Sequence, residues 1–587
     1  MKNKNIISTI IVSAFVMLGS CGEDFLYIAP QGSIDQNALM NQTGIDLLTT
    51  SAYANFSENG WGASITNWTF GSMYGGDANK GSDANDQSVL NTMETYSILP
   101  TNGYIGEKYA WVYKGVKRVN VALQTIDATE GLPEAFQQSR TGEMHFLRAI
   151  FYFEGIKVFG PHLPWVDETI TDNDPKVHND VDIYPKVLAD IDIAIESLPD
   201  VQDMPGRANS WAARALKAKV LMQKGDFAAA KPILKDVIDQ GVTSNGLKYG
   251  LEDNMNLNFY SPTDNGKESV FAIQFSSDYN NANTGISIAY PHGGSGSPGG
   301  CCGFYQPSNE LANSYKVDAN GLPLLDKSYR NAPYVAERNT GSGFLSVNGN
   351  MAVDPRLDFV IGRFGVPYKD WGLPQNNWVR DVANGGFYMP KKHVYTKEEL
   401  DAGLAGGGLS DGWAPGSAIN VQYLSFRDII LLYAECLAND DELGAAMGYV
   451  NQIRTRAAHP DNIIYQKKGQ QTDPDVPAAN YRVKNYPATH PAFSDKNVCI
   501  QAIRMERKLE LAMEGQRWFD LARWGGTYMA KELAEYVDFE KEFITKFASA
   551  AKLDASKTMF PLPDGQIQTM GNDENGEPYL VQPAPWK

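Results

Sequence analysis

The sequence predicts a mainly α-helical protein, in which paired helices form a scaffold and a large irregular, loop-rich region holds a few short strands. The clearest helix starts at Ala502, where apolar side chains recur at steps of three and four and so share one face. Between Gly250 and Ala418 the composition changes to Gly, Pro, Asn and aromatic residues, with one expected strand over residues 269–275. Irregular segments of this length inside a compact protein are usually functional.

Two helical hairpins are expected, one on each side of this region. Asn209 is expected to cap the first hairpin, and Gly225 with Asp226 turns the chain, because glycine reaches left-handed backbone angles cheaply and aspartate caps helix starts. Residues 211–240 have the length and turn of a tetratricopeptide-like hairpin, and residues 423–458 repeat the pattern. The other expected helices span residues 34–56, 104–126, 136–159, 184–198 and 528–549. Residues 502–526 are expected to be helical with a break that Gly515 permits.

One domain, residues 21–587, contains both parts. The tetratricopeptide-like scaffold is expected at about residues 34–250 and 419–587. The loop-rich region, expected to bind the ligand, covers about residues 57–100 and 251–418. Loops of this kind run over the surface and commonly carry function.

The N-terminus has the pattern of an export signal. Lys2 and Lys4 form a short basic region, and the apolar run that follows is too short to span a membrane. Leu18-Gly19-Ser20-Cys21 then resembles the lipobox of a bacterial lipoprotein, which implies a leader of residues 1–20 and a lipid on Cys21. An ordinary secretory signal is the alternative. No other run approaches the length of a membrane-spanning helix, so the lipid is the expected anchor.

Composition and motifs exclude several functions. With 51 basic and 69 acidic residues the net charge is −18, which repels phosphate backbones and disfavours nucleic acid as a partner. Residues 294–299 match a dinucleotide-binding glycine pattern, but no helix follows, as that site requires. No zinc-protease, P-loop or serine-hydrolase motif occurs, and the cysteines lack zinc spacing. We expect no catalytic residue, cofactor or metal, and interpret Glu510, Glu514 and Asp520 as scaffold charges rather than an enzyme site.

A series of short motifs runs along essentially the whole mature chain. They are the lipobox, residues 147–164, 214–227, 429–435 with 451–454, 506–525 and 560–563. In their joint order they resemble the RagB/SusD family. The resemblance implies a lipid-anchored protein on the surface of the Bacteroidetes outer membrane, which binds a glycan and passes it to a SusC-like TonB-dependent transporter. A peptide-binding member of the family and an enzyme acting on a glycan are the alternatives.

Candidate ligand-binding residues come from both loop-rich segments. Sugar binding needs aromatic rings for the apolar face of the sugar and planar polar groups for its hydroxyls. The candidates are Asn55, Trp61, Trp68, Asp77, Tyr96, Tyr290, Cys301, Cys302, Arg380 and Tyr395, with Asp83, Tyr279, Tyr305, Trp371 and Trp378 beside them in sequence. For each aromatic residue, packing within the loop region is the alternative.

Cys301 and Cys302 are adjacent in a glycine-rich loop. In an oxidising compartment they can close a small ring, a vicinal disulfide. Such a ring is flat, apolar and rigid on one side, so a sugar could stack on it as on an aromatic ring, while the glycines let a ligand approach the backbone. The alternatives are two free thiols or pairing with other cysteines.

Replacing Cys21 with Ala should release the protein from membranes, because no other residue offers a lipidation site. Fractionation of cells that express the protein without a transporter measures this directly. Cys499→Ala is the matched control and should stay with the membrane. A Cys21→Ala protein that still fractionates with the outer membrane would contradict the lipoprotein interpretation.

Overall fold

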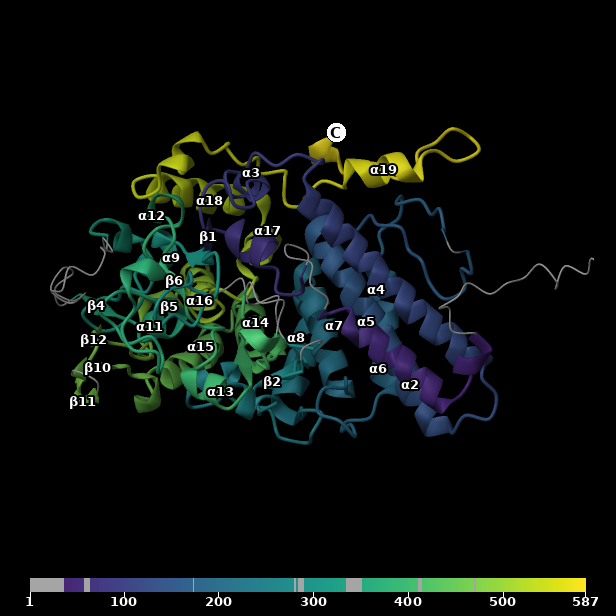
Figure 1. Cartoon of the computed structure of the whole chain (residues 1–587), viewed down its shortest axis with the longest axis horizontal. Helices are drawn as coiled ribbons and strands as arrows, with labels where there is room; N and C mark the ends of the chain where they lie inside the picture. Colours follow the sequence, from purple (N-terminus) through teal and green to yellow (C-terminus); the bar gives the residue numbers. More distant parts are fainter. Residues whose placement is uncertain are drawn as a thin grey trace, which may run out of the picture.

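The computed structural model describes residues 36–57, 64–172, 174–278, 281–282, 290–333, 351–409, 414–468 and 471–587. The long helices between residues 42 and 240 lie together at the right in Figure 1, while the long helices from residue 443 onward lie at the left with the short helices, strands and loops. Within these ranges, no helix combines the length and the apolar character needed to cross a bilayer. The predicted mainly α-helical fold with an irregular region is confirmed.

The long helices pack as neighbours along the chain. They are α2 Gln42–Ala54, α4 Gly103–Ala128, α5 Glu134–Phe159, α6 Tyr184–Ser197, α7 Ser210–Lys224, α8 Phe227–Gln240, α14 Phe426–Asn439, α15 Leu443–Ala457, α16 Lys496–Glu510 and α18 Gly526–Glu540. Helix α14 packs against its own partner α15 and also against α8. The second hairpin therefore stacks on the first, as expected of a tetratricopeptide-like scaffold.

The turn between α7 and α8 uses the predicted residues. The side chain of Asn209 accepts a hydrogen bond from the backbone N–H of Ala212 at 2.8 Å. Gly225 follows the last residue of α7 with a φ of +86°, and the Asp226 carboxylate then accepts from the N–H of Ala229 at 3.1 Å. Both helix starts and the turn therefore follow from local chemistry.

Two predicted boundaries differ from the structure. Helix α2 starts later than residue 34, and α18 ends before residue 549. The predicted break at Gly515 is present, because it separates two helices, α16 and α17 (Arg517–Arg523). The break is sharp because Gly515, with a φ of +71°, lies directly against the backbone of Thr66, where a side chain would collide.

The strands form only two-stranded sheets within the described residues. The pairs are β1 Ala78–Gly81 with β3 Phe304–Pro307, β2 Ser269–Ile273 with β9 Val421–Ser425, β4 Ala352–Val353 with β12 Asn480–Tyr481, β5 Ile361–Gly362 with β6 Met389–Pro390, β7 Ala405–Gly406 with β8 Gly416–Ser417, and β10 Tyr465–Lys468 with β11 Gln471–Pro477. The short helices are α3 Val89–Glu94, α9 Asn309–Ser314, α11 Arg356–Val360, α12 Val382–Gly385, α13 Lys397–Asp401 and α19 Asp564–Met570. Strand β2 confirms the predicted strand, and the β1–β3 pair joins the two loop-rich segments.

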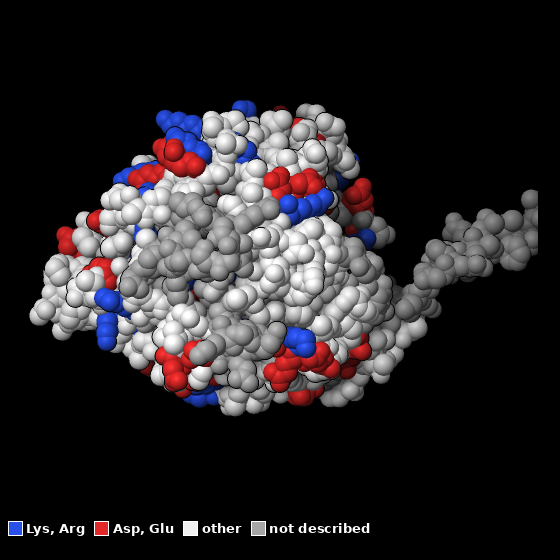
Figure 2. Space-filling model, turned by 60° about the vertical axis from the view of Figure 1, so that its left-hand side comes forward, with Lys and Arg blue, Asp and Glu red and all other residues white. Residues whose placement is uncertain are grey.

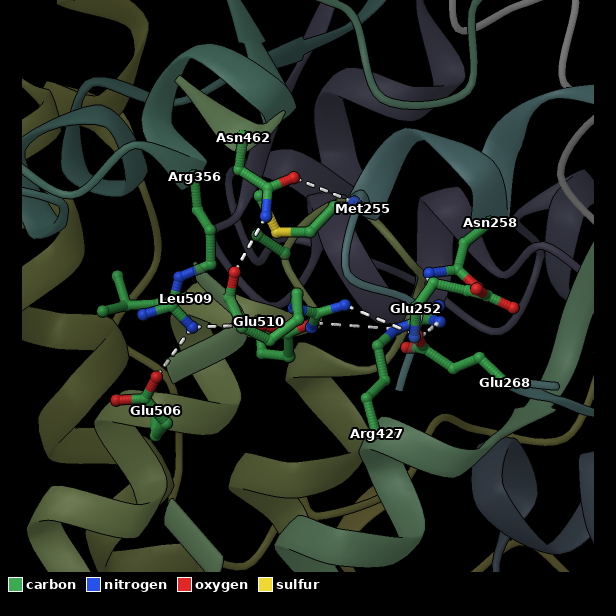
Figure 3. A network of polar contacts seen from close by, with 12 residues as sticks. Glu252, Met255, Asn258, Glu268, Arg356, Arg427, Asn462, Glu506, Leu509 and Glu510 are labelled. Atoms are coloured by element: carbon green, nitrogen blue, oxygen red, sulfur yellow. Dashed lines mark hydrogen bonds and ion pairs between the residues drawn. The ribbon is translucent and has the colours of Figure 1, made fainter. Parts of the chain in front are cut away.

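Glu506 and Glu510 of helix α16 form buried ion pairs with three other elements (Figure 3). Glu506 pairs with Arg356 of α11 at 2.7 Å and with Arg454 of α15 at 3.1 Å. Glu510 pairs with Arg356 at 3.1 Å and lies 4.0 Å from Arg427 of α14. Removing one member would leave a buried charge without its partner, which is strongly destabilising. These contacts therefore fix α16 against both the scaffold and the loop-rich region.

Helix α17 packs on the π-helix η3 (Trp68–Met73) through Trp518. The Trp518 ring lies 4.6 Å from that of Tyr74 and 5.7 Å from that of Phe560, and only 1% of the residue is exposed. The sequence predicts that both Trp518 and Trp524 are largely buried, because each can bury a large apolar area, but Trp524 is only half-buried. Its indole N–H donates to the Glu435 carboxylate at 2.8 Å, so it remains at the edge of the core.

Replacing Trp518 with Ala should lower the free energy of unfolding by about 3–5 kcal/mol, because it removes a large buried ring and leaves a cavity. Chemical denaturation of the purified protein measures the change. Trp524→Ala is the comparison and should cost less, since part of its ring is already in contact with water. Equal stability of the Trp518→Ala and unmodified proteins would contradict this packing.

Candidate functional site

Cys301 and Cys302 form a disulfide with each other in the loop before β3. Both are half-buried, and Cys302 has a φ of +73°, the left-handed region that few residues other than glycine adopt. The N–H of Gly303 donates to the Cys301 carbonyl at 2.9 Å. The predicted vicinal disulfide is therefore present, at a point where the backbone turns tightly and part of each side chain stays accessible.

A small cluster of buried aromatic residues packs against this loop and forms hydrogen bonds with its backbone. Tyr290, Tyr368, Trp378 and Tyr395 belong to a hydrophobic cluster that is separate from the main core. The Tyr395 hydroxyl donates to the Pro298 carbonyl at 2.6 Å, and the Trp378 indole donates to the backbone carbonyl of the loop at residue 295 at 3.2 Å. These side chains therefore hold the loop in place with their polar ends while their rings stay buried.

Arg380 lies beside the loop and joins it to the first loop-rich segment. Its guanidinium contacts Asp83 at 2.6 Å and Asp86 at 2.7 Å, and 35% of its side chain is exposed. It also donates to the Ser82 hydroxyl at 2.9 Å, and the Ser82 N–H donates to the Gly303 carbonyl at 2.8 Å. Disulfide, guanidinium and carboxylates thus come together from the two segments in which we expected the ligand site.

Most of the other predicted candidates lie inside the protein. The buried ones are Asn55, Trp68, Asp77, Tyr96, Tyr290, Tyr305, Trp378 and Tyr395, while Trp371 is half-buried. Cys21, Trp61 and Tyr279 lie outside the described residues. A ring with no exposed face cannot stack on a sugar, so the packing alternative describes these aromatic residues. Residue type alone does not distinguish buried aromatic residues from ligand-binding ones, because aromatic side chains occur both in protein cores and in sugar sites.

Two residues at this site were missed in the sequence. Asp86 completes the carboxylate pair on Arg380, and Asn377 is exposed with its amide against the backbone of Gly294. Both lie far along the chain from the cysteines, so only the folded structure brings them near the loop. The amide next to Trp378 at position 377 was the one available signal, since amides and aromatic residues occur together in sugar sites.

The acidic residues of the scaffold motif are all ion-paired, as interpreted from the sequence. Burial by itself would raise the pKa of Glu510, but Arg456 and Arg356 outweigh it and hold the pKa at about 2. Burial would also raise the pKa of Glu514, but Arg427 and Lys392 outweigh it and hold this pKa below its usual value. A carboxyl group held ionised by fixed arginines is not arranged to donate a proton, as a glycosidase acid must.

Figure 2 brings forward the side on which Figure 1 labels β4, α11 and α9. Lys, Arg, Asp and Glu gather there in separate groups, mostly toward the rim, and the white area to the right of the centre carries no charged residue. An uncharged surface can offer hydroxyls, amides and rings to a ligand without attracting phosphate or other strong anions.

Comparisons with known proteins agree with this architecture. Residues 267–582 match the model of the SusD family, and residues 24–222 match a model described as starch-binding associating with outer membrane. A SusD-like protein of Bacteroides ovatus is 22% identical over 541 residues, covering 88% of this chain and 82% of the relative.

Solved structures show the same fold. A SusD superfamily protein from Bacteroides vulgatus aligns with a TM-score of 0.64 at 18% identity, covering 93% of this chain and 99% of that one. Surface glycan-binding protein A from Bacteroides thetaiotaomicron, in complex with laminarihexaose, aligns with a TM-score of 0.60 at 16% identity, covering 92% and 99%. A laminarin-binding SusD-like protein gives 0.61 at 19% identity, covering 93% and 99%.

The buried carboxyl group of Asp77 should make the free energy of unfolding depend on pH. Burial raises its pKa to about 6, although Arg517 and Lys508 oppose the rise, and its Oδ1 has no hydrogen-bond partner among the described residues. Because the folded-state pKa exceeds the unfolded value of 3.8, ionisation costs stability as the pH rises from about 4 to about 6. Asp77→Asn should therefore gain on the order of 2–3 kcal/mol at pH 8 and little at pH 4.

Denaturation of both proteins at the two pH values measures this gain. Asp83→Asn is the control and should give no gain, because the backbone amides of Asp86 and Asn85 hold the pKa of the half-buried Asp83 below its usual value. An Asp77→Asn protein that is no more stable at pH 8, relative to the unmodified protein, than at pH 4 would contradict the raised pKa.

Proposed function

The chain belongs to the SusD family, and on that premise we propose that it captures a neutral glycan at the cell surface and passes it to a SusC-like TonB-dependent transporter. The names of its relatives support the binding role, since solved structures with the same fold are described as laminarin-binding and glycan-binding. The matched model described as starch-binding associating with outer membrane supports the location. The lipid on Cys21 is proposed as the anchor.

The proposed binding site rests on one observation, the Cys301–Cys302 disulfide in a loop that is held by buried aromatic side chains. A vicinal disulfide offers a rigid apolar face. The hydrogen bonds from Tyr395 and Trp378 of the aromatic cluster restrain the loop that holds it. Rigid groups lose little conformational entropy on binding, which favours affinity. We therefore place the apolar face of a sugar ring on this disulfide.

The polar groups beside the disulfide complete the site. Arg380 has donors in a fixed fork, and Asp83 and Asp86 are acceptors, so the group can bond hydroxyls in either direction. Lys80, whose ammonium donates to the backbone carbonyls of Asp83 and Asp86 at 2.9 and 2.7 Å, supplies a second positive charge. Two cations therefore stand against two carboxylates, and the group attracts neither strong anions nor cations. The exposed Asn377 amide adds a donor and an acceptor on the other side of the loop. This balance favours a neutral glycan.

Serine in place of both Cys301 and Cys302 should weaken glycan binding by more than tenfold, about 1.4 kcal/mol, because the apolar face is lost. Thermal stability should stay nearly unchanged, since the loop keeps its other anchors. Titration calorimetry with the best ligand from a glycan array, laminarihexaose included, measures the affinity. Intact mass should show the unmodified protein lighter by two hydrogen atoms than its reduced form.

Ser295→Ala is the matched control, because it alters an exposed side chain of the same loop and leaves the disulfide intact. It should bind as the unmodified protein does. If the double variant keeps full affinity, the binding site lies elsewhere, and Trp61→Ala in the segment 57–100 becomes the next test. If no glycan on the array binds, while a peptide library does, the peptide-binding alternative replaces this proposal.

A further inference from the structure

A cavity of about 450 Å³ lies among η7 (Ser328–Arg330), α16 and α18, away from the Cys301–Cys302 loop. Six basic residues line it against three acidic ones, whereas acids outnumber bases 69 to 51 in the whole chain. The basic residues are Lys327, Arg330, Arg504, Lys508, Arg517 and Lys531. A strongly acidic protein thus contains one cavity whose lining has the opposite charge.

The acids of this cavity are already engaged. Glu532 and Glu535 both accept from Lys327, and Glu535 also accepts from Arg330 at 2.9 Å. The Asp326 carboxylate accepts from the hydroxyl of Ser328 at 2.7 Å. These pairs satisfy Lys327 and Arg330, and Lys508 pairs with Glu310 at 3.1 Å. Arg517 and Lys531 have only more distant acids, at 3.6 and 4.0 Å, and Arg504 has no paired acid among the described residues.

Two guanidinium groups in the lining lack a hydrogen-bonded acid among the described residues. Arg504 lies over the rings of both Trp524 and Tyr528, 4.7 and 4.2 Å from their centroids, and its Nε is buried without a hydrogen-bond partner among the described residues. Only 9% of the Arg517 side chain is exposed, yet its closest carboxylate, that of Glu532, is 3.6 Å away, beyond good hydrogen-bond range. Stacking on rings fixes the Arg504 plane but does not satisfy its N–H groups.

We propose that this cavity binds an oxyanion, the carboxylate or sulfate group of an acidic sugar. Buried donors without acceptors cost free energy, and guanidinium forks match planar oxyanions with two parallel hydrogen bonds. Tyr528 also lines the cavity, and its ring holds the Arg504 guanidinium in position there. The residues of the cavity are the argument that the ligand is an oxyanion. The inference that a sugar carries this oxyanion rests on the proposed function.

Three sugars with the same ring test the proposal: galacturonate, galactose 6-sulfate and galactose. Titration at constant ionic strength should show at least one of the two anions binding tenfold or more tightly than neutral galactose. Binding of both identifies a general oxyanion site, and binding of one identifies carboxylate or sulfate as the source. If neither anion binds more tightly than galactose, the proposal is overturned.

Two variants locate the binding. Arg504→Gln should weaken anion binding at least tenfold, and Gln501→Glu, at an exposed position of α16 that lines the same cavity, should do so by repulsion without affecting the fold. Lys224→Gln, at the exposed end of α7, removes one positive charge elsewhere and should leave the affinity unchanged. Unchanged affinity in both cavity variants would overturn the proposal.

Failure of this inference is separable from failure of the proposed neutral-glycan site. Both cavity variants should bind the neutral glycan as the unmodified protein does, because Arg504 and Gln501 do not line the disulfide loop. Anion binding without any neutral-glycan binding would leave the cavity in place and remove the disulfide site. Neutral-glycan binding without anion binding would do the opposite.

Discussion

The buried ion pairs of α16 are the constraint on which the rest of the structure depends. Glu506 and Glu510 stand where arginines from α11 and α15 converge, and Arg507 of the same helix pairs with Asp428 of α14 at 2.8 Å and Asp520 of α17 at 2.9 Å. Buried charges are tolerated only in their paired geometry, so these contacts admit one arrangement of the helices. An apolar interface would allow sliding that this one does not.

The same contacts connect the scaffold to the candidate site. Arg356, which pairs with α16, begins α11, and α11 leads directly into β5. Strand β5 pairs with β6, and Met389 of β6 belongs to the aromatic cluster beneath the disulfide loop. The β1–β3 pair then brings Asp83, which follows β1, to the loop that precedes β3, and Arg380 contacts Asp83 there. A rigid helical frame thus positions a small group of side chains on irregular backbone, which is a common division of labour in binding proteins.

The sequence predicted what local chemistry decides. Asn209, Gly225 and Asp226 set the α7–α8 turn by capping and by a left-handed glycine, and the adjacent cysteines form the expected disulfide. It did not predict which aromatic residues are buried. Tyr290 and Tyr395 are of a residue type common in sugar sites, but both are buried and pack beside the disulfide loop. Nor could it pair Arg380 with Asp83 and Asp86, because such contacts depend on the fold of almost three hundred intervening residues, and helical periodicity carries no information about them.

The central claim is that the disulfide loop, and not the buried aromatic residues, receives the glycan. A crystal structure of the protein with laminarihexaose, or with the best ligand from a glycan array, tests it most directly. The account predicts a sugar ring stacked on Cys301 and Cys302, with Arg380 or Asp83 bonded to its hydroxyls. A glycan bound to other residues, with this loop in contact with solvent only, would contradict it.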